Sequence, residues 1–137
     1  MKSIQIEKFG GPEVFVIKDM DIGKPGPKEV LIKNKSIGLN FIDVYHRTGL
    51  YPIPLPSGIG LEASGVIEEI GSDVKLFKVG DRVTHASMPI GAYSEKQIMP
   101  IAVKVVSEDE YQEWLSEARV KFAKEEIEND KLKLASK

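Results

Sequence analysis

The feature that most constrains the fold is a glycine-punctuated stretch at residues 60–83, GLEASGVIEEIGSDVKLFKVGDRV. Glycine permits positive φ angles and close backbone approach, so this spacing is typical of tight turns, bulges and barrel corners. Val66, Ile67 and Ile70 supply β-prone positions before the chain turns, and residues 79–83 resemble a second turn leading back into a strand. Many short strands separated by glycine and proline turns favour a partly closed β-barrel over a helical bundle.

Composition excludes several classes of protein. The chain has 137 residues, 42% of them apolar and 29% charged, as in one globular domain. A net charge of −2 gives no reason to expect nucleic acid or an anionic membrane as a partner. Cysteine is absent, which excludes disulfides, thiolate zinc sites and a cysteine nucleophile, and is compatible with the cytoplasm, where we expect the protein. We expect neither a secretory signal nor a membrane span.

The chain changes character near residue 106. Every glycine and proline lies at or before Pro100, whereas residues 107–137 hold 6 Lys/Arg and 9 Asp/Glu. Ser107 and Glu110 have the spacing of a capping box, which predicts the start of a helix. Apolar residues follow at helical spacing: Tyr111, Trp114, Leu115, Ala118 and Phe122. We therefore predict a β domain at 1–106 and an amphipathic helix or tail at 107–137.

Within the β domain, the alternation of polar and apolar residues predicts a strand at 1–7, and β-prone residues predict further strands at 14–17, 29–37, 91–98 and 101–106. One short helix is expected at residues 40–47, with Asn40 as its N-cap residue and Asp43 three positions later. Phe41, Val44 and Tyr45 then share a face of that helix.

A family resemblance rests on ordered motifs. The pattern G-x-E-x-x-G-x-V/I at residues 60–67, followed by GDRV at 80–83, resembles the GroES-like domain of medium-chain dehydrogenases/reductases. The flanking segments GLNFIDVY at 38–45 and GLYP at 49–52 resemble the quinone oxidoreductase branch, which is zinc-independent. The resemblance covers about residues 1–98 and implies a partly open GroES-like β-barrel. With the tail, the expected fold is mainly β with a C-terminal helix and without a Rossmann domain.

The resemblance also implies a site. In the family, NADPH lies in a cleft between this barrel and a Rossmann domain, and Asn40, Tyr45 and Tyr51 would border the nicotinamide and the quinone. An amide and two phenols suit a planar quinone, although Tyr45 as core packing and Asn40 as a mere N-cap remain open alternatives. The sequence has no G-x-G-x-x-G turn, so we expect no cofactor on this chain alone and no turnover by it.

Zinc is not expected. The zinc-dependent branch has a cysteine where this chain has Asn40 and a histidine where it has Leu61. His46 and His85 are expected to be ordinary surface histidines or satisfied ones, because a zinc site needs three or four converging ligands. We expect Asp43 to cap the helix, and Glu62, if buried, to need a partner such as Arg82.

The tail carries a second resemblance. Residues 99–115, MPIAVKVVSEDEYQEWL, resemble the C-terminal end of cytochrome c oxidase subunit II, whose copper ligands have no counterpart here. We therefore interpret the chain as a chimera joined near Ile98–Met99, the alternative being a divergent native ending.

The resulting hypothesis is a truncated substrate-side domain of an NADPH-dependent quinone oxidoreductase-like protein. One alternative is a standalone interaction module that forms homo-oligomers through the barrel flank or the helix. In another, a separate polypeptide supplies the Rossmann half.

Overall fold

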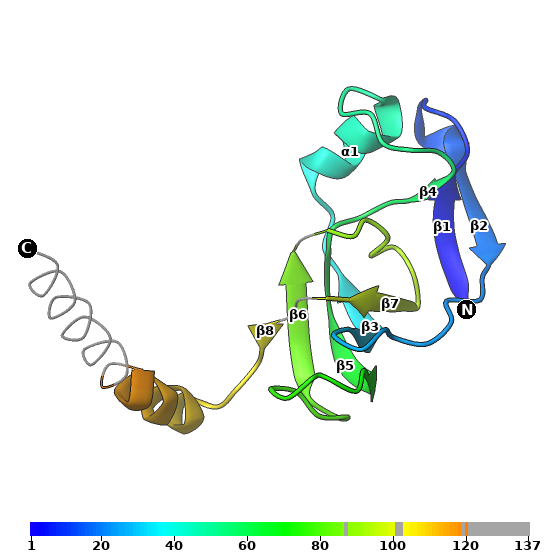
Figure 1. Ribbon diagram of the computed structural model, residues 1–137. Helices are drawn as coiled ribbons and strands as arrows, with labels where there is room; N and C mark the ends of the chain where they lie inside the picture. Colours follow the sequence, from blue (N-terminus) through cyan, green and yellow to red (C-terminus); the bar gives the residue numbers. More distant parts are fainter. Residues whose placement is uncertain (87, 101–102, 119, 121–137) are drawn as a thin grey trace, which may run out of the picture. The chain divides into compact units, whose positions relative to one another are not determined.

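The computed structural model describes residues 1–86, 88–100, 103–118 and 120. The chain divides into two compact units, Met1–Val105 and Val106–Lys137. The first unit consists of short β-strands, one α-helix and one 3-10 turn, η1 at Pro12–Val14 (Figure 1). Every strand pairing among the described residues is antiparallel. The prediction of a mainly β fold is therefore confirmed.

The strands form two sheets. The smaller sheet has the order β2-β1-β4, and Ile4 of β1 lies opposite Ile17 of β2. Its strands are β1 (Lys2–Ile6), β2 (Phe15–Asp19) and β4 (Ser57–Gly58). The larger sheet has the order β7-β3-β5-β6-β8. Its strands are β3 (Val30–Ile37), β5 (Glu62–Ile70), β6 (Arg82–Ala86), β7 (Lys96–Met99) and β8 (Val103–Lys104). Its edge strands β7 and β8 do not pair with each other within the described chain, so the barrel is open.

The central pair, β3 and β5, shows why the glycine-punctuated stretch matters. Gly65 lies opposite Asn34, and a Cβ atom built on Gly65 would lie 2.2 Å from the carbonyl oxygen of Lys33. Only glycine fits at so close an approach. The register shifts between Asn34 and Ser36, which is the irregularity expected at a β-bulge. Buried positions alternate along β5, whereas Val30, Leu31 and Ile32 at the start of β3 are all buried.

Two apolar clusters hold the unit together. The larger belongs to the five-stranded sheet and consists of Val30, Ile32, Ile67, Val83 and Met99. The smaller lies under the three-stranded sheet and consists of Ile6, Val14 and Ile59, with Tyr93 packed against it. Because Tyr93 also carries a polar hydroxyl group, this packing brings a phenol to the edge of the core.

Helix α1 (Phe41–Thr48) confirms the short helix expected near residues 40–47. Asn40 is the N-cap residue with an extended backbone, and Gly49 ends the helix with a φ of 83°. The structure turns two apolar side chains of this helix, Phe41 and Val44, outward. Phe41 is 83% exposed, whereas the buried positions are Asp43 and His46. Asp43 and His46 therefore face the interior, whereas Phe41 and Val44 face solvent and Ile42 and Tyr45 are partly buried.

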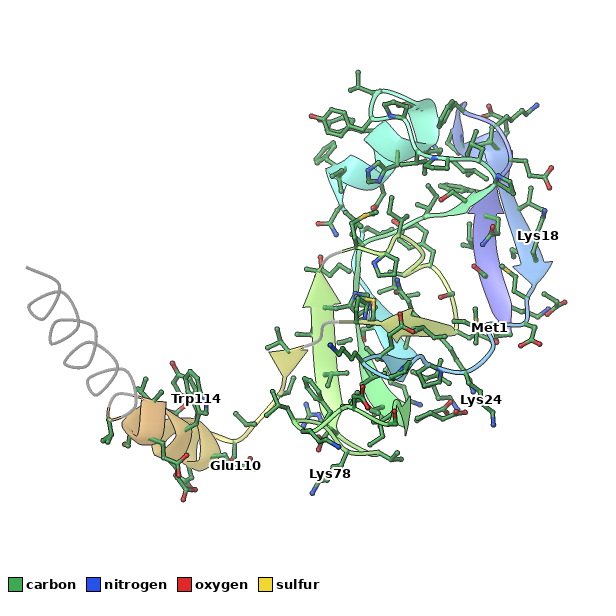
Figure 2. The ribbon with its side chains drawn as sticks, viewed as in Figure 1. Met1, Lys18, Lys24, Lys78, Glu110 and Trp114 are labelled. Carbon is green, nitrogen blue, oxygen red and sulfur yellow. The ribbon has the colours of Figure 1, made fainter. Side chains whose placement is uncertain are left out.

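The second unit contains a helix over residues 108–118. Its predicted capping box is present: the backbone N–H of Ser107 donates to Glu110 Oε2 over 2.9 Å, and the Glu110 N–H donates to Ser107 Oγ over 3.3 Å. Tyr111 and Trp114 stack with ring centroids 6.0 Å apart, and Trp114 projects from the helix (Figure 2). Phe122, the last residue of the predicted stripe, lies outside the described residues. In the described part of the chain, no helix has the length and apolar character needed to cross a bilayer.

Candidate functional site

The start of α1 is held by hydrogen bonds between Asn40 and Asp43. The backbone N–H of Asn40 donates to Asp43 Oδ2 over 2.9 Å, and the Asp43 N–H donates to the Asn40 carbonyl oxygen over 3.0 Å. Both residues therefore cap the helix, as the sequence predicts. The Asp43 carboxylate also complements the positive end of the helix dipole.

The Asn40 side chain has a partner that the sequence did not identify. Its amide nitrogen Nδ2 donates to Glu62 Oε2 over 2.8 Å. The prediction that Arg82 is the partner of Glu62 is wrong. In the pairing of β5 with β6, Arg82 lies opposite Val66, whereas Glu62 lies opposite Ala86. Four residues along a strand separate the two side chains by about 13 Å. Glu62 therefore fixes the orientation of the Asn40 amide, and Asn40 is more than an N-cap residue.

Asp43 is also joined to the segment before β7. The Tyr93 hydroxyl donates to Asp43 Oδ2 over 2.8 Å, and only 5% of Asp43 is exposed. Burial, and then the hydrogen bond to Asp43 and its charge, raise the pKa of the Tyr93 phenol well above its usual range. Tyr93 therefore stays protonated and can serve as a permanent donor to the carboxylate.

Gly60 leaves room for this phenol. It has a φ of 92°, and a Cβ atom on it would lie 2.4 Å from Cδ1 of Tyr93. Sequence analysis missed Tyr93 because 50 residues separate it from Asp43. The positive φ and the contact belong to the folded backbone, so no local pattern identifies the pair.

Tyr45 and Tyr51 form a separate aromatic pair. Their ring centroids lie 5.3 Å apart with the rings inclined at 69°, an edge-to-face contact. The Tyr51 N–H donates to the Tyr45 carbonyl oxygen over 3.2 Å, which ties the loop after α1 to the helix. The structure thus brings the two predicted tyrosines together at the C-terminal half of α1, while Asn40 stands at its beginning.

Asn40 instead borders a hollow of about 350 Å³ on the exposed side of α1. Arg47 lies over the ring of Phe15, with its guanidinium carbon 5.6 Å from the ring centroid. The lining residues are Phe15, Leu39, Asn40, Phe41, Asp43, Val44, Arg47 and Tyr93. The hollow thus combines an apolar rim with amide, carboxylate and phenol groups, which is the usual composition of a small-molecule site.

The two histidines are buried rather than at the surface. His85 Nδ1 lies 3.2 Å from the Leu61 carbonyl oxygen, while Nε2 of His85 and Nδ1 of His46 have no hydrogen-bond partner among the described residues. Burial lowers the pKa of His85, opposed by the Leu61 carbonyl and by the charge of Glu62. Within the described ranges, no three His, Cys, Asp or Glu side chains converge as a metal site would require.

The amino-acid sequence matches one protein family and several of its members. The family model for the alcohol dehydrogenase GroES-like domain matches residues 26–106. A quinone oxidoreductase from Pseudomonas aeruginosa is 54% identical over 99 residues, covering 72% of this chain and 30% of the relative. A 2-haloacrylate reductase from Burkholderia sp. is 45% identical over 100 residues, covering 69% of this chain and 30% of the relative.

Solved structures agree with these matches. The crystal structure of Escherichia coli quinone oxidoreductase in complex with NADPH matches with a TM-score of 0.76 and 43% identity, covering 77% of this chain and 33% of that one. The chain therefore spans about 30% of the length of the curated relatives it matches. The family match extends to residue 106, past the junction predicted near Ile98–Met99, and the chimeric origin of the tail stays a prediction.

Proposed function

The chain belongs to the alcohol dehydrogenase GroES-like domain family, in its quinone oxidoreductase type, and on that premise we propose that it is the substrate-side part of an NADPH-dependent quinone oxidoreductase-like protein. The observation that carries this proposal is the Asn40 amide, held by Glu62 at the edge of an apolar hollow. A fixed amide offers one remaining N–H donor and a carbonyl acceptor in a defined direction.

Asn40, Tyr45 and Tyr51 are the residues proposed to border the nicotinamide and the quinone. The amide of Asn40, at the start of α1, would hydrogen-bond to a carbonyl of either group, and the tyrosine pair at the other end of the helix would offer aromatic rings for stacking. NADPH supplies a hydride when it is bound. The chain's own contribution is to orient the acceptor and to keep water from one side of it.

The residues fit only the nicotinamide end of that cofactor. A pyrophosphate group is usually held at a glycine-rich turn between a parallel strand and a helix, and all pairings among the described strands are antiparallel. We therefore propose that a nucleotide-binding part, on the same or a separate polypeptide, is needed for turnover. We also propose the cytoplasm as the compartment.

Two measurements test this proposal. Two-dimensional NMR of the chain titrated with a soluble naphthoquinone should shift the signals of Asn40, Tyr45 and Tyr51, and Asn40→Ala should weaken the binding. Leu76→Ala, at an exposed position outside the hollow, is the matched control. Signals that stay unshifted at all three residues would refute the proposed wall, and quinone-dependent oxidation of NADPH by the chain alone would refute the need for another part.

The second candidate is an interaction or oligomerisation module, favoured by one observation on the helix of the second unit. Its stacked aromatic residues are exposed, Trp114 at 58% and Tyr111 at 44%. Exposed aromatic side chains of this kind are enriched at protein interfaces. Light scattering after size-exclusion chromatography should show an oligomer that Trp114→Ala dissociates; a monomer in both cases would remove this candidate.

A further inference from the structure

A methionine just after β2 has a side-chain amide as its neighbour. The Gln5 side-chain nitrogen Nε2 donates to Met20 Sδ over 3.1 Å. The same nitrogen donates to Ser3 Oγ over 3.3 Å, which is long for a hydrogen bond to oxygen. A thioether sulfur is only a weak acceptor, so neither contact satisfies the amide well. A strong donor therefore lies beside a sulfur atom that would become a better acceptor if it carried an oxygen.

The backbone of Met20 is fixed on both sides. Its N–H donates to the Met1 carbonyl oxygen over 2.8 Å, and its own carbonyl oxygen accepts a bond of 2.9 Å from the Met1 nitrogen. These bonds continue the pairing of β1 with β2, which ends with Lys2 opposite Asp19. A chemical change at the Met20 sulfur therefore takes place on a backbone that is already held in the sheet.

The sulfur is accessible, and there is space beside it. Met20 is 39% exposed, whereas Met99, another of the four methionines, is fully buried. Met20 and Gln5 both line a hollow of about 330 Å³. Gln5 lies opposite Gly58 in the pairing of β1 with β4, and a Cβ atom on Gly58 would lie 3.6 Å from Gln5 Nε2. The hollow thus admits a small oxidant and leaves room for one added oxygen.

We propose that Met20 is an oxidation site, at which a hydroperoxide converts the thioether to a sulfoxide that the Gln5 amide then holds. A lone pair of the sulfur attacks one peroxide oxygen, so an S–O bond forms and the O–O bond breaks. With hydrogen peroxide, the proton on the transferred oxygen passes to the departing hydroxide, which leaves as water. The sulfur is oxidised by two electrons and the peroxide is reduced. Rotation about the Cγ–Sδ bond of Met20 brings the polar oxygen within reach of the Gln5 N–H. This inference is independent of the quinone proposal.

Gln5 also determines which sulfoxide forms. Methionine sulfoxide has two epimers, because the oxidised sulfur is a chiral centre. The Gln5 N–H occupies one lone pair of the Met20 sulfur and leaves the other to the oxidant, so one epimer should be in excess. Each epimer is reduced to methionine by its own class of methionine sulfoxide reductase, which makes the modification reversible and distinguishes the two epimers.

The test treats the full chain with hydrogen peroxide and follows the peptide that contains Met20 by mass spectrometry. Reduction of the digest by each class of reductase gives the epimer ratio. We expect about a threefold excess or more of one epimer, the preference that one neutral hydrogen bond supports, and near-equal amounts in Gln5→Leu, which lacks the donor. Met99 should stay unoxidised as long as the chain is folded.

Thermal unfolding followed by NMR signals of β5 gives the second measurement. Oxidation should leave the midpoint of the unsubstituted chain unchanged, whereas it should lower that of Gln5→Leu by about 4 °C or more, because the sulfoxide then lacks its donor. Met20→Leu is the matched control, since any shift that peroxide causes in this variant comes from the other methionines. NMR spectra verify that the variants fold. Gln5→Glu, whose ionised carboxylate has no donor, replaces Gln5→Leu if the latter does not fold.

Three results would overturn the proposal. The first is a Met20 that stays unoxidised while Met88, which is 62% exposed, is oxidised. The second is an equal mixture of Met20 epimers in the unsubstituted chain, which would show that Gln5 does not direct the oxidant. The third is an equal loss of thermal stability on oxidation with and without the Gln5 amide, which would show that the amide does not hold the sulfoxide.

Discussion

Replacing Tyr93 with phenylalanine removes one hydroxyl group and leaves the packed ring in place. That hydroxyl donates to Asp43 Oδ2 over 2.8 Å at a carboxylate that is only 5% exposed. The other oxygen, Asp43 Oδ1, is buried without a partner among the described residues, so the remaining support of the carboxylate is the Asn40 N–H. Hydrogen bonds to charged groups contribute about 1.5–3 kcal/mol, and we expect Tyr93→Phe to lower the free energy of unfolding by about 2 kcal/mol.

The assay is urea unfolding followed by NMR signals of β5, which belongs to the first unit, whereas the single tryptophan, Trp114, belongs to the second. Tyr51→Phe is the matched control, since Tyr51 is 52% exposed and its hydroxyl has no hydrogen bond within the described residues. In an Asp43→Asn background, the cost of Tyr93→Phe should fall by about 1 kcal/mol or more. A cost below about 0.5 kcal/mol in the unmodified background would show that the Tyr93–Asp43 bond contributes little to stability.

Three further predictions follow from single positions. Because the pKa of His85 is lowered in the folded state, the unfolded state binds more protons than the folded state below pH 6.5. The free energy of unfolding should therefore fall as the pH drops through that value, by less than about 1.4 kcal/mol per pH unit. His85→Asn should flatten this dependence of the free energy of unfolding on pH. Gly60→Ala should destabilise the first unit by about 3 kcal/mol, because strain at positive φ adds to the clash with Tyr93. Gly80→Ala, at a φ of 93° with open space around it, should cost only about 1 kcal/mol in the same denaturation assay. Ser107→Ala should cost the second helix about 1 kcal/mol, seen as lower helicity in circular dichroism, and unchanged helicity would contradict the capping role.

Local signals predicted the elements well where the physical cause is itself local. The N-cap at Asn40 and the capping box at Ser107 depend on side chains three residues from their partners, and both are present. The run of β-prone apolar residues that opens residues 29–37 likewise predicts β3, because such side chains pack well on the pleated surface of a sheet. The resemblance to the GroES-like domain added the open barrel, which the sheet order confirms.

Electrostatic partners were harder to predict because they depend on register. Arg82 was the candidate partner expected for Glu62 if that carboxylate were buried. The pairing of β5 with β6 instead places Arg82 opposite Val66 and leaves Glu62 to accept a hydrogen bond from Asn40. A sequence gives the charges but not the distance along a strand at which they meet.

The amino-acid sequence by itself determined the family, the strand-rich character of the first unit and both helix starts, because each depends on residues close together in the chain. Only the tertiary structure decided that Tyr93 hydrogen-bonds to Asp43, that Phe41 faces solvent, and that the Gln5 amide lies against the Met20 sulfur. These features depend on which segments, far apart in sequence, become neighbours when the sheets form. Burial and backbone pairing are set by that global arrangement, and local preferences do not encode it.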